Sequence, residues 1–223
     1  MKHILVFDVN ETLLDLSALD PHFARAFGDA KVRSEWFQTM LGSAFLTTIA
    51  GPYKPFGEHF RAALALTAQR HNVRLDRDDE AAILSGVRSL PAHADVPPAL
   101  ERLRAAGYRL AAFTNSTAEV ENAQLRNAGL AKFFEAAISA DDAKRLKPAP
   151  EAYAHAATAL GAKPSGLRMI AAHVWDVHGA MRAGLAAAYV ERKGMVWNPL
   201  LDRPDVVGTD LGEVAEKVIA LDR

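Results

Sequence analysis

The chain has 223 residues, of which 26 are basic and 27 acidic, giving a formal net charge of -1 at pH 7. That balance gives no support for a nucleic-acid or membrane-surface partner, and the absence of cysteine excludes disulfides, thiol catalysis and thiolate metal sites. No apolar stretch is long enough for a signal peptide or a transmembrane helix, so we expect a soluble, cytoplasmic protein.

The first predicted element is a short apolar run at residues 4–7, which the polar sequence Asp8-Val9-Asn10-Glu11-Thr12 follows. Such a run is typical of a strand buried on both faces of a parallel sheet, with Asp8 at its carboxyl end. Ligands bind at that edge of open α/β sheets. A carboxylate there can be a nucleophile, a metal ligand or a cap of the next turn.

Residues 16–90 carry helical periodicity and no convincing strand. Asp20-Pro21 is typical of a helix start, and Asp76 of the cap of a helix that ends near Gly86. We therefore predict an all-helical domain at 16–90, inserted into a core domain formed by 1–15 and 91–223. Its aromatic residues are expected mainly to pack in a core.

From residue 91 the pattern alternates between strands and helices. Strands are predicted at 108–113, 136–139, 169–172 and 186–190, and helices at 96–106, 150–160 and 211–221, with two more that stop at Gly129 and Gly184. Repeated β-then-α units predict an α/β fold with a right-handed, doubly wound parallel sheet.

Polar residues follow several of these strands, and in a parallel sheet they meet at one edge. They are Asp8, Thr114, Asn115, His173 and Asp176, with Lys147 in the loop after the third strand. This convergence favours a functional site over simple capping.

With these motifs in order, the chain resembles the haloacid dehalogenase superfamily over its whole length. The matching motifs are Asp8 with Thr12, then Thr114-Asn115, then Lys147-Pro148, then Asp176. The resemblance implies an α/β core, and it identifies the helical block as a mobile cap.

Two departures bear on the chemistry within that superfamily. Its phosphatases generally place a second Asp two residues after the nucleophile, but here Asn10 stands there, and an amide does not exchange protons near pH 7. Mg²⁺-dependent members usually have a pair of acids where Asp176 is alone. A metal site completed by Asp141 or Asp142 stays open as an alternative, and a cluster of His173, Asp176 and His178 lacks a third strong ligand.

More closely, the chain resembles the L-2-haloacid dehalogenases, through Asn10, Trp175-Asp176 and Lys147 followed later by Tyr153. The implied reaction has Asp8 displace halide from a short 2-haloacid and water hydrolyse the resulting aspartyl ester, without metal or organic cofactor. Lys147 would keep Asp8 ionised, and Asp176 would pair with Lys147 and orient or activate the water. The resemblance assigns supporting contacts to Thr12, Thr114, Asn115 and Tyr153. A strand-end cap for Thr114, ring packing for Tyr153 and a surface ion pair for Lys147 are the alternatives.

The predicted cap departs from that subfamily at the halide site. The usual Arg after a Trp is replaced by Phe37 after Trp36, while Gln38, Leu41 and Phe56 match other pocket positions. Before Trp175-Asp176, the usual Ser and Asn are Ala171 and His173. We hypothesise that His173, with Trp175 and Gln38, replaces part of the missing halide contact. A histidine satisfied by the backbone of its turn is the alternative.

Three functions therefore remain in view. The first is a metal-independent dehalogenase that binds a small 2-haloacid and, by resemblance, forms a homodimer through the helical cap. The second is a Mg²⁺-dependent phosphatase of the same fold, which Asn10 disfavours. The third is a non-catalytic binding protein that kept the fold after losing the halide Arg.

Overall fold

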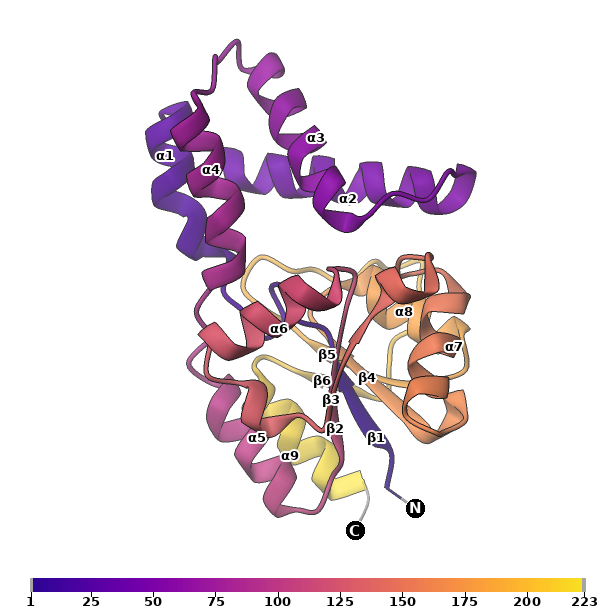
Figure 1. The fold of residues 1–223 in the computed structure, drawn as a ribbon. Helices are drawn as coiled ribbons and strands as arrows, with labels where there is room; N and C mark the ends of the chain where they lie inside the picture. The colour runs from indigo at the N-terminus through magenta and orange to yellow at the C-terminus, as the bar shows by residue number, and fades with distance from the viewer. Residues whose placement is uncertain (1, 222–223) are drawn as a thin grey trace.

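The computed structural model describes residues 2–221 (Figure 1). A parallel sheet of six strands has the order β3-β2-β1-β4-β5-β6. The strands are β1 (Ile4–Phe7), β2 (Leu110–Thr114), β3 (Ala136–Ser139), β4 (Leu167–Ala171), β5 (Ala186–Val190) and β6 (Val206–Gly208). This arrangement confirms the predicted doubly wound α/β fold. Strand β6 was not predicted.

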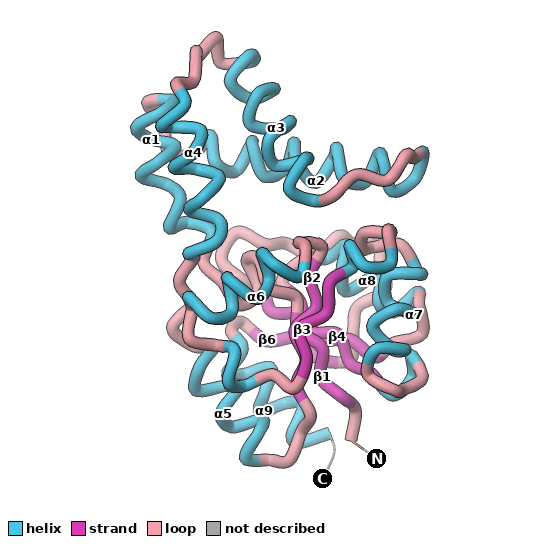
Figure 2. Tube along the Cα trace, viewed as in Figure 1, coloured by secondary structure: helices cyan, strands magenta, loops and turns pink. Residues whose placement is uncertain are grey.

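Helices cover both faces of the sheet and its carboxyl edge (Figure 2). The sheet is packed by α5 (Val96–Ala105), α6 (Ala118–Asn127), α7 (Pro150–Ala159), α8 (Val174–Arg182) and α9 (Leu211–Leu221). Short 3-10 turns lie at Leu16–Leu19, Val87–Ser89, Ala131–Phe133, Ala140–Ala143 and Pro164–Gly166. None of the helices within residues 2–221 is long and apolar enough to cross a membrane.

Beyond the carboxyl edge lie α1 (Asp20–Phe27), α2 (Val32–Ala50), α3 (Phe56–Arg70) and α4 (Arg77–Gly86). We call them the α1–α4 segment. The side chain of Asp76 caps α4 by accepting a 2.7 Å hydrogen bond from the backbone N–H of Asp79. Pro21 lies in the first turn of α1, although Leu19 rather than Asp20 is the N-cap residue. The assignment of residues 16–90 as a separate domain stays a prediction.

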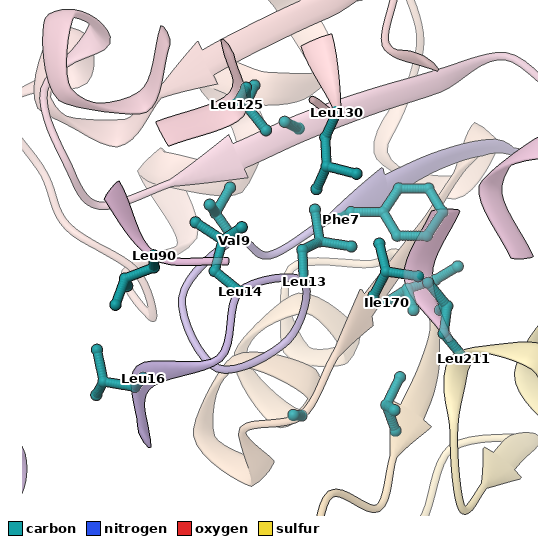
Figure 3. Close-up of a cluster of buried hydrophobic side chains, with 14 of the residues drawn as sticks. Phe7, Val9, Leu13, Leu14, Leu16, Leu90, Leu125, Leu130, Ile170 and Leu211 are labelled. Atoms are coloured by element: carbon teal, nitrogen blue, oxygen red, sulfur yellow. The ribbon is translucent and has the colours of Figure 1, made fainter. Parts of the chain in front are cut away.

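Strand β1 lies inside the sheet, and its alternate side chains pack into two separate apolar cores. Leu5 and Phe7 belong to the core under α5 and α9, and Ile4 and Val6 belong to the core under α7 and α8. The first core continues through the turn after β1, where Leu13 and Leu14 are fully buried (Figure 3). It extends into the α1–α4 segment through side chains such as Phe23 and Trp36. This continuous packing fixes the turn that carries Asp8.

Candidate active site

Asp8 and Lys147 form the centre of a buried ionic group at the carboxyl edge of the sheet. The backbone N–H of Asp8 donates to Ile170 O of β4 at 3.0 Å, which holds Asp8 at the end of β1. Lys147 Nζ donates to Asp8 Oδ1 at 2.9 Å, to Asp176 Oδ2 at 2.6 Å and to the carbonyl of Phe113 at 3.0 Å. Three acceptors satisfy all three ammonium protons, so a fully buried cation is fully bonded.

Asp176 is bonded just as completely. Besides Lys147, it receives the Tyr153 hydroxyl on Oδ1 at 2.7 Å. Gly179, one turn further along α8, allows this contact, because a Cβ there would lie 2.6 Å from Tyr153 Oη and 2.6 Å from Pro148 Cβ. We call Asp8, Lys147, Asp176 and Tyr153 the carboxylate–lysine cluster.

The charges of this cluster shift its pKa values in a consistent way. Burial alone would raise the pKa of Asp8, but Lys147, His173 and the 2.6 Å hydrogen bond from Thr12 lower it well below the usual range. Burial opposes the charge on Lys147, yet the Asp176 and Asp8 carboxylates raise its pKa. Burial raises the pKa of Asp176 against the opposing effect of Lys147, and the Asp8 charge adds to the rise. Asp8 is therefore an ionised carboxylate beside a permanent cation.

The amide of Asn115 positions the lysine rather than pointing freely into the site. Its Oδ1 accepts from the backbone N–H of Lys147 at 2.7 Å, and its Nδ2 donates to the Lys147 carbonyl at 3.1 Å. Thr114 Oγ1 accepts from the backbone N–H of Ser116 at 3.2 Å, which leaves the Thr114 hydroxyl proton available. The Thr12 hydroxyl oxygen accepts from the backbone N–H of Ala172 at 2.9 Å, tying the turn after β1 to the end of β4.

His173 faces Asp8 from the other side. Its Nε2 lies 2.8 Å from Glu11 Oε2, and its Nδ1 lies 3.4 Å from Asp8 Oδ2 without an aligned hydrogen bond. The ring stacks with Phe37, with centroids 5.8 Å apart, and with Trp175, with centroids 5.2 Å apart. Burial would lower the pKa of His173, but its contacts with Asp8 and Glu11 outweigh it and raise the pKa to about 9. His173 is thus an imidazolium at neutral pH.

A cavity of about 10 Å³, room for roughly one water, lies between the cluster and the α1–α4 segment. We call the side chains that face the cluster across this cavity the aromatic wall: Phe37, Leu41, Phe56, His173 and Trp175. The remaining lining residues are Asp8, Asn10, Thr114, Asn115 and Lys147. The indole N–H of Trp175 has no partner among the described residues.

Nine of the thirteen predicted site residues line this cavity. Thr12, Asp176 and Tyr153 are hydrogen-bonded to the cluster behind it, and Gln38 lies away from it. Gln38 is exposed on α2, because its neighbour Phe37 takes the inward-facing position on the helix. The structure therefore corrects the placement of Gln38 as a halide contact. Tyr153 reaches the site only through Asp176, and Asn10 accepts a 2.9 Å hydrogen bond from Gln124 in addition to lining the cavity.

Glu11 was not among the predicted site residues. It has a left-handed backbone with φ 62°, which turns its side chain toward His173 and, at 3.8 Å, toward Arg33 of α2. Its place within the Asp8-to-Thr12 motif was the signal that could have found it. Asp141 lies elsewhere, bonded to Tyr53 and Lys144.

The cluster does not fit a divalent metal. The Lys147 ammonium occupies the position between Asp8 and Asp176 that a bridging cation would need, and Asn10 supplies an amide where a third carboxylate would stand. Within residues 2–221 no group of three His, Asp or Glu side chains is placed to hold a metal ion, so the described residues give no support for a site that includes Asp141, Asp142 or His178.

Comparisons with known proteins agree with this geometry. A family model described as haloacid dehalogenase-like hydrolase matches residues 2–184. The (S)-2-haloacid dehalogenase 2 of Pseudomonas sp. (strain CBS-3) is 29% identical over 94% of this chain and 93% of its own length. The haloacetate dehalogenase H-2 of Moraxella sp. (strain B) is 30% identical over 92% and 93%.

A solved structure shows the same fold. The L-2-haloacid dehalogenase of Xanthobacter autotrophicus has a TM-score of 0.91 and 26% identity, with 98% of both chains covered. A second structure of that protein has chloropropionic acid covalently bound, with the same TM-score, identity and coverage.

Proposed function

The chain belongs to the haloacid dehalogenase-like hydrolase family, and on that premise we propose that it hydrolyses the carbon–halogen bond of short 2-haloalkanoic acids, releasing halide and a 2-hydroxy acid. One observation carries the proposal. An ionised Asp8 lines a cavity of about 10 Å³ and is held by Lys147 where a metal would otherwise be needed, and the residue two positions on is an amide. This arrangement supplies a nucleophile and no carboxylic acid to protonate a phosphate leaving group.

In the first half-reaction Asp8 attacks the carbon that bears the halogen and forms an aspartyl ester. Lys147 keeps Asp8 ionised, since a cation at about 4 Å contributes about 4 kcal/mol at an effective dielectric near 20. Thr12 fixes the carboxylate by donating to Oδ2. A single displacement inverts the carbon.

The departing halide requires a hydrogen-bond donor, because a missing hydrogen bond to a charged group costs about 1.5–3 kcal/mol. Phe37 offers none. His173 and Trp175 line the cavity, and Nδ1 of His173 and the indole N–H of Trp175 have no hydrogen-bond partner among the described residues. We assign the halide to this pair, with Phe37, Leu41 and Phe56 excluding water.

The substrate carboxylate is assigned to the loop after β2. Thr114 and Asn115 line the cavity, shortly before α6, whose N-cap residue is Thr117. The Thr114 hydroxyl proton and backbone N–H groups of this loop would hold the carboxylate. Such groups at a helix start attract an anion. Lys147, which Asn115 positions, adds a positive charge nearby.

The second half-reaction returns the enzyme to its start. Water attacks the carboxyl carbon of Asp8, and the ester bond breaks to release the 2-hydroxy acid. Lys147 and Asp176, braced by Tyr153, hold the Asp8 carboxyl group in place while this occurs.

Three further features are proposed with this activity. The α1–α4 segment acts as a cap domain that opens for substrate, because the cavity as it stands holds about one water. The resemblance implies a homodimer, and the sequence pattern led us to expect a cytoplasmic location. Gel filtration and cell fractionation test these two proposals.

The test is halide release from haloacetates and from the two enantiomers of 2-chloropropionate, with EDTA present. Asp8→Asn is the inactive variant, and Asp142→Asn, an exposed carboxylate, is the matched control. A parallel assay holds a generic aryl phosphate with Mg²⁺.

Halide release by the wild type and by Asp142→Asn, but not by Asp8→Asn, supports the proposal. Phosphate release that depends on Mg²⁺ contradicts it. Silence in both assays, with tight substrate binding, favours a binding protein.

A further inference from the structure

A second pocket lies next to the active-site cavity and borders the same loop after β2. Its volume is about 310 Å³, against about 10 Å³ for the cavity. The α1–α4 segment lies on one side of it and the start of α6 on the other (Figure 1). We call it the α3–α6 pocket and define it by Arg61 of α3, Arg88, and Ser116 and Thr117 before α6.

The pocket and the cavity are separated by single residues of two chain segments. After β2, Asn115 lines the cavity and the next residue, Ser116, lines the pocket. On α3, Phe56 lines the cavity and the next residue, Gly57, lines the pocket. The ring of Phe56 packs edge-on against Phe60, which lines the pocket, with centroids 5.1 Å apart. A movement of the Phe56 ring would therefore join the two spaces.

The charges around the pocket suit an anion. Arg61 is exposed and has no ion-pair partner among the described residues. Arg88 is paired with Glu119, whose side chain is 80% exposed, and such a surface pair is weak enough to be exchanged for a ligand. Glu58, the acidic residue among those that line the pocket, lies 3.6 Å from Lys54. The lining thus has two cations and one anion, and that anion already has a partner.

The start of α6 adds backbone donors to these cations. Thr117 is the N-cap residue of this ten-residue helix, and its side chain makes no capping hydrogen bond. The first N–H groups of a helix have no acceptor within the helix, and they attract anions. Thr117 and Val120 both line the pocket, so this end of the helix borders it.

Ser116 points independently to a ligand. It is 3% exposed, its backbone N–H donates to Thr114 Oγ1 at 3.2 Å, and its carbonyl accepts from the Ser139 hydroxyl at 2.7 Å. Its own hydroxyl has no partner among the described residues, and leaving a buried hydroxyl unbonded is costly. A carboxylate held at the start of α6 would accept a hydrogen bond from it.

We propose that the α3–α6 pocket is an anion-binding antechamber. Arg61, Arg88, the Ser116 hydroxyl and the start of α6 hold the carboxylate of a 2-haloacid there, before the acid passes Phe56 into the cavity. The inference rests on the dehalogenase activity proposed above. The antechamber acts on capture of the substrate and not on the chemical step, because Asp8 does not line it.

Steady-state halide release from chloroacetate tests the capture step. Arg61→Gln removes the cation, Arg61→Lys keeps its charge, and Arg70→Gln removes the same charge from the opposite end of α3. We expect Arg61→Gln to lower kcat/KM about 5-fold through a raised KM, with kcat unchanged. Arg61→Lys and Arg70→Gln should stay within about 2-fold of the wild type. The kcat/KM of the wild type should fall more steeply with added salt than that of Arg61→Gln.

Propionate, which carries no halogen, tests binding without turnover. Phenylglyoxal modifies accessible arginines, and peptide masses give the rate at each one. Propionate should slow the modification of Arg61 and Arg88 and leave that of Arg70 unchanged. In Ser116→Ala, protection of Arg61 should require more propionate than in the wild type.

The two assays separate failure of the antechamber from failure of the proposed function. Halide release with equal kcat/KM in Arg61→Gln and Arg70→Gln would overturn the antechamber and leave the dehalogenase proposal intact. Halide release without protection of Arg61 by propionate would do the same. No halide from the wild type, with Arg61 still protected, would overturn the dehalogenase proposal and with it the haloacid as the ligand.

Discussion

The carboxylate–lysine cluster and the aromatic wall face each other across one cavity, yet their polar atoms are bonded to different extents. In the cluster, the Lys147 ammonium and both oxygens of Asp176 have short partners. In the wall, Nδ1 of His173 and the indole N–H of Trp175 have none among the described residues. The cluster, whose polar atoms all have hydrogen-bond partners, holds the nucleophile in place. The wall, whose polar atoms lack some partners, is available to bind substrate, halide and water.

The largest effect should come from breaking the cluster at its cation. Lys147→Met removes the cation that two buried carboxylates, Asp8 and Asp176, share, so we expect about 3–5 kcal/mol of lost stability and little remaining activity. Urea unfolding and halide release measure the two effects. Lys54→Met, in which the lost amine is a half-exposed surface partner of Glu58, should change stability by less than about 1 kcal/mol. Equal losses of stability in the two variants would show that the buried Lys147 contributes no more than a surface lysine.

The next effect tests the charge of the wall. The pKa of His173 rises from its ordinary value of 6.5 to about 9. A raised pKa in the folded state gives stability that is fully present below pH 6.5 and is lost as pH rises through about 9. Its full size is about 3 kcal/mol.

Chemical unfolding at pH 6 and at pH 10 measures this effect. When the pH is raised between these two values, the wild type should lose about 3 kcal/mol more unfolding free energy than His173→Asn. Parallel pH profiles for the two proteins would mean that His173 is not charged in the folded state.

A buried acid outside both groups provides an independent comparison. Glu121 of α6 is fully buried without an aligned partner for either oxygen, and burial, against the attraction of Lys147, raises its pKa to about 9. Its stability contribution is present below pH 4.5 and is lost as pH rises toward about 9. Glu121→Gln should therefore be more stable than the wild type by up to about 5 kcal/mol at pH 8, with little difference at pH 4.5. Glu119→Gln, on the exposed side of the same helix, should show no such pH dependence.

The smallest expected effect sharpens the contrast between Phe37 and His173. An Arg at position 37 would lie against the imidazolium of His173. Phe37→Arg alone should therefore slow the first release of halide about 10-fold relative to the wild type. In the His173→Asn background the same change supplies a cation that the wall then lacks, and it should speed the burst. A double-mutant cycle on the burst rate measures the coupling. Additive effects would show that the two positions do not share the halide.

Much of the cluster could be predicted because parallel strands bring their carboxyl ends together. Asp8, Lys147 and Asp176 are far apart in the sequence, but each follows an element whose type the apolar pattern indicates. The predicted strands at 4–7, 136–139 and 186–190 and the helix at 211–221 have the bounds found in the structure.

The wall was harder to predict, because it depends on how α2 is rotated about its axis. Trp36, Phe37, Met40 and Leu41 are all buried, so the apolar pattern of α2 did not show which residue would face Asp8, and Gln38 was placed inward when Phe37 is. Strand β6 was missed because it has three residues and ends in Gly208. Glu11 reaches His173 only through a left-handed turn, which residue pattern alone does not indicate.

The most direct test of the central claim, that Asp8 becomes an ester, is a single turnover in H₂¹⁸O with enzyme in excess over haloacetate. If Asp8 is the nucleophile, the first product takes its hydroxyl oxygen from Asp8 and carries no label, while one ¹⁸O enters the Asp8 peptide. If water attacks the substrate directly, the product carries the label and the Asp8 peptide does not. That result would contradict the account.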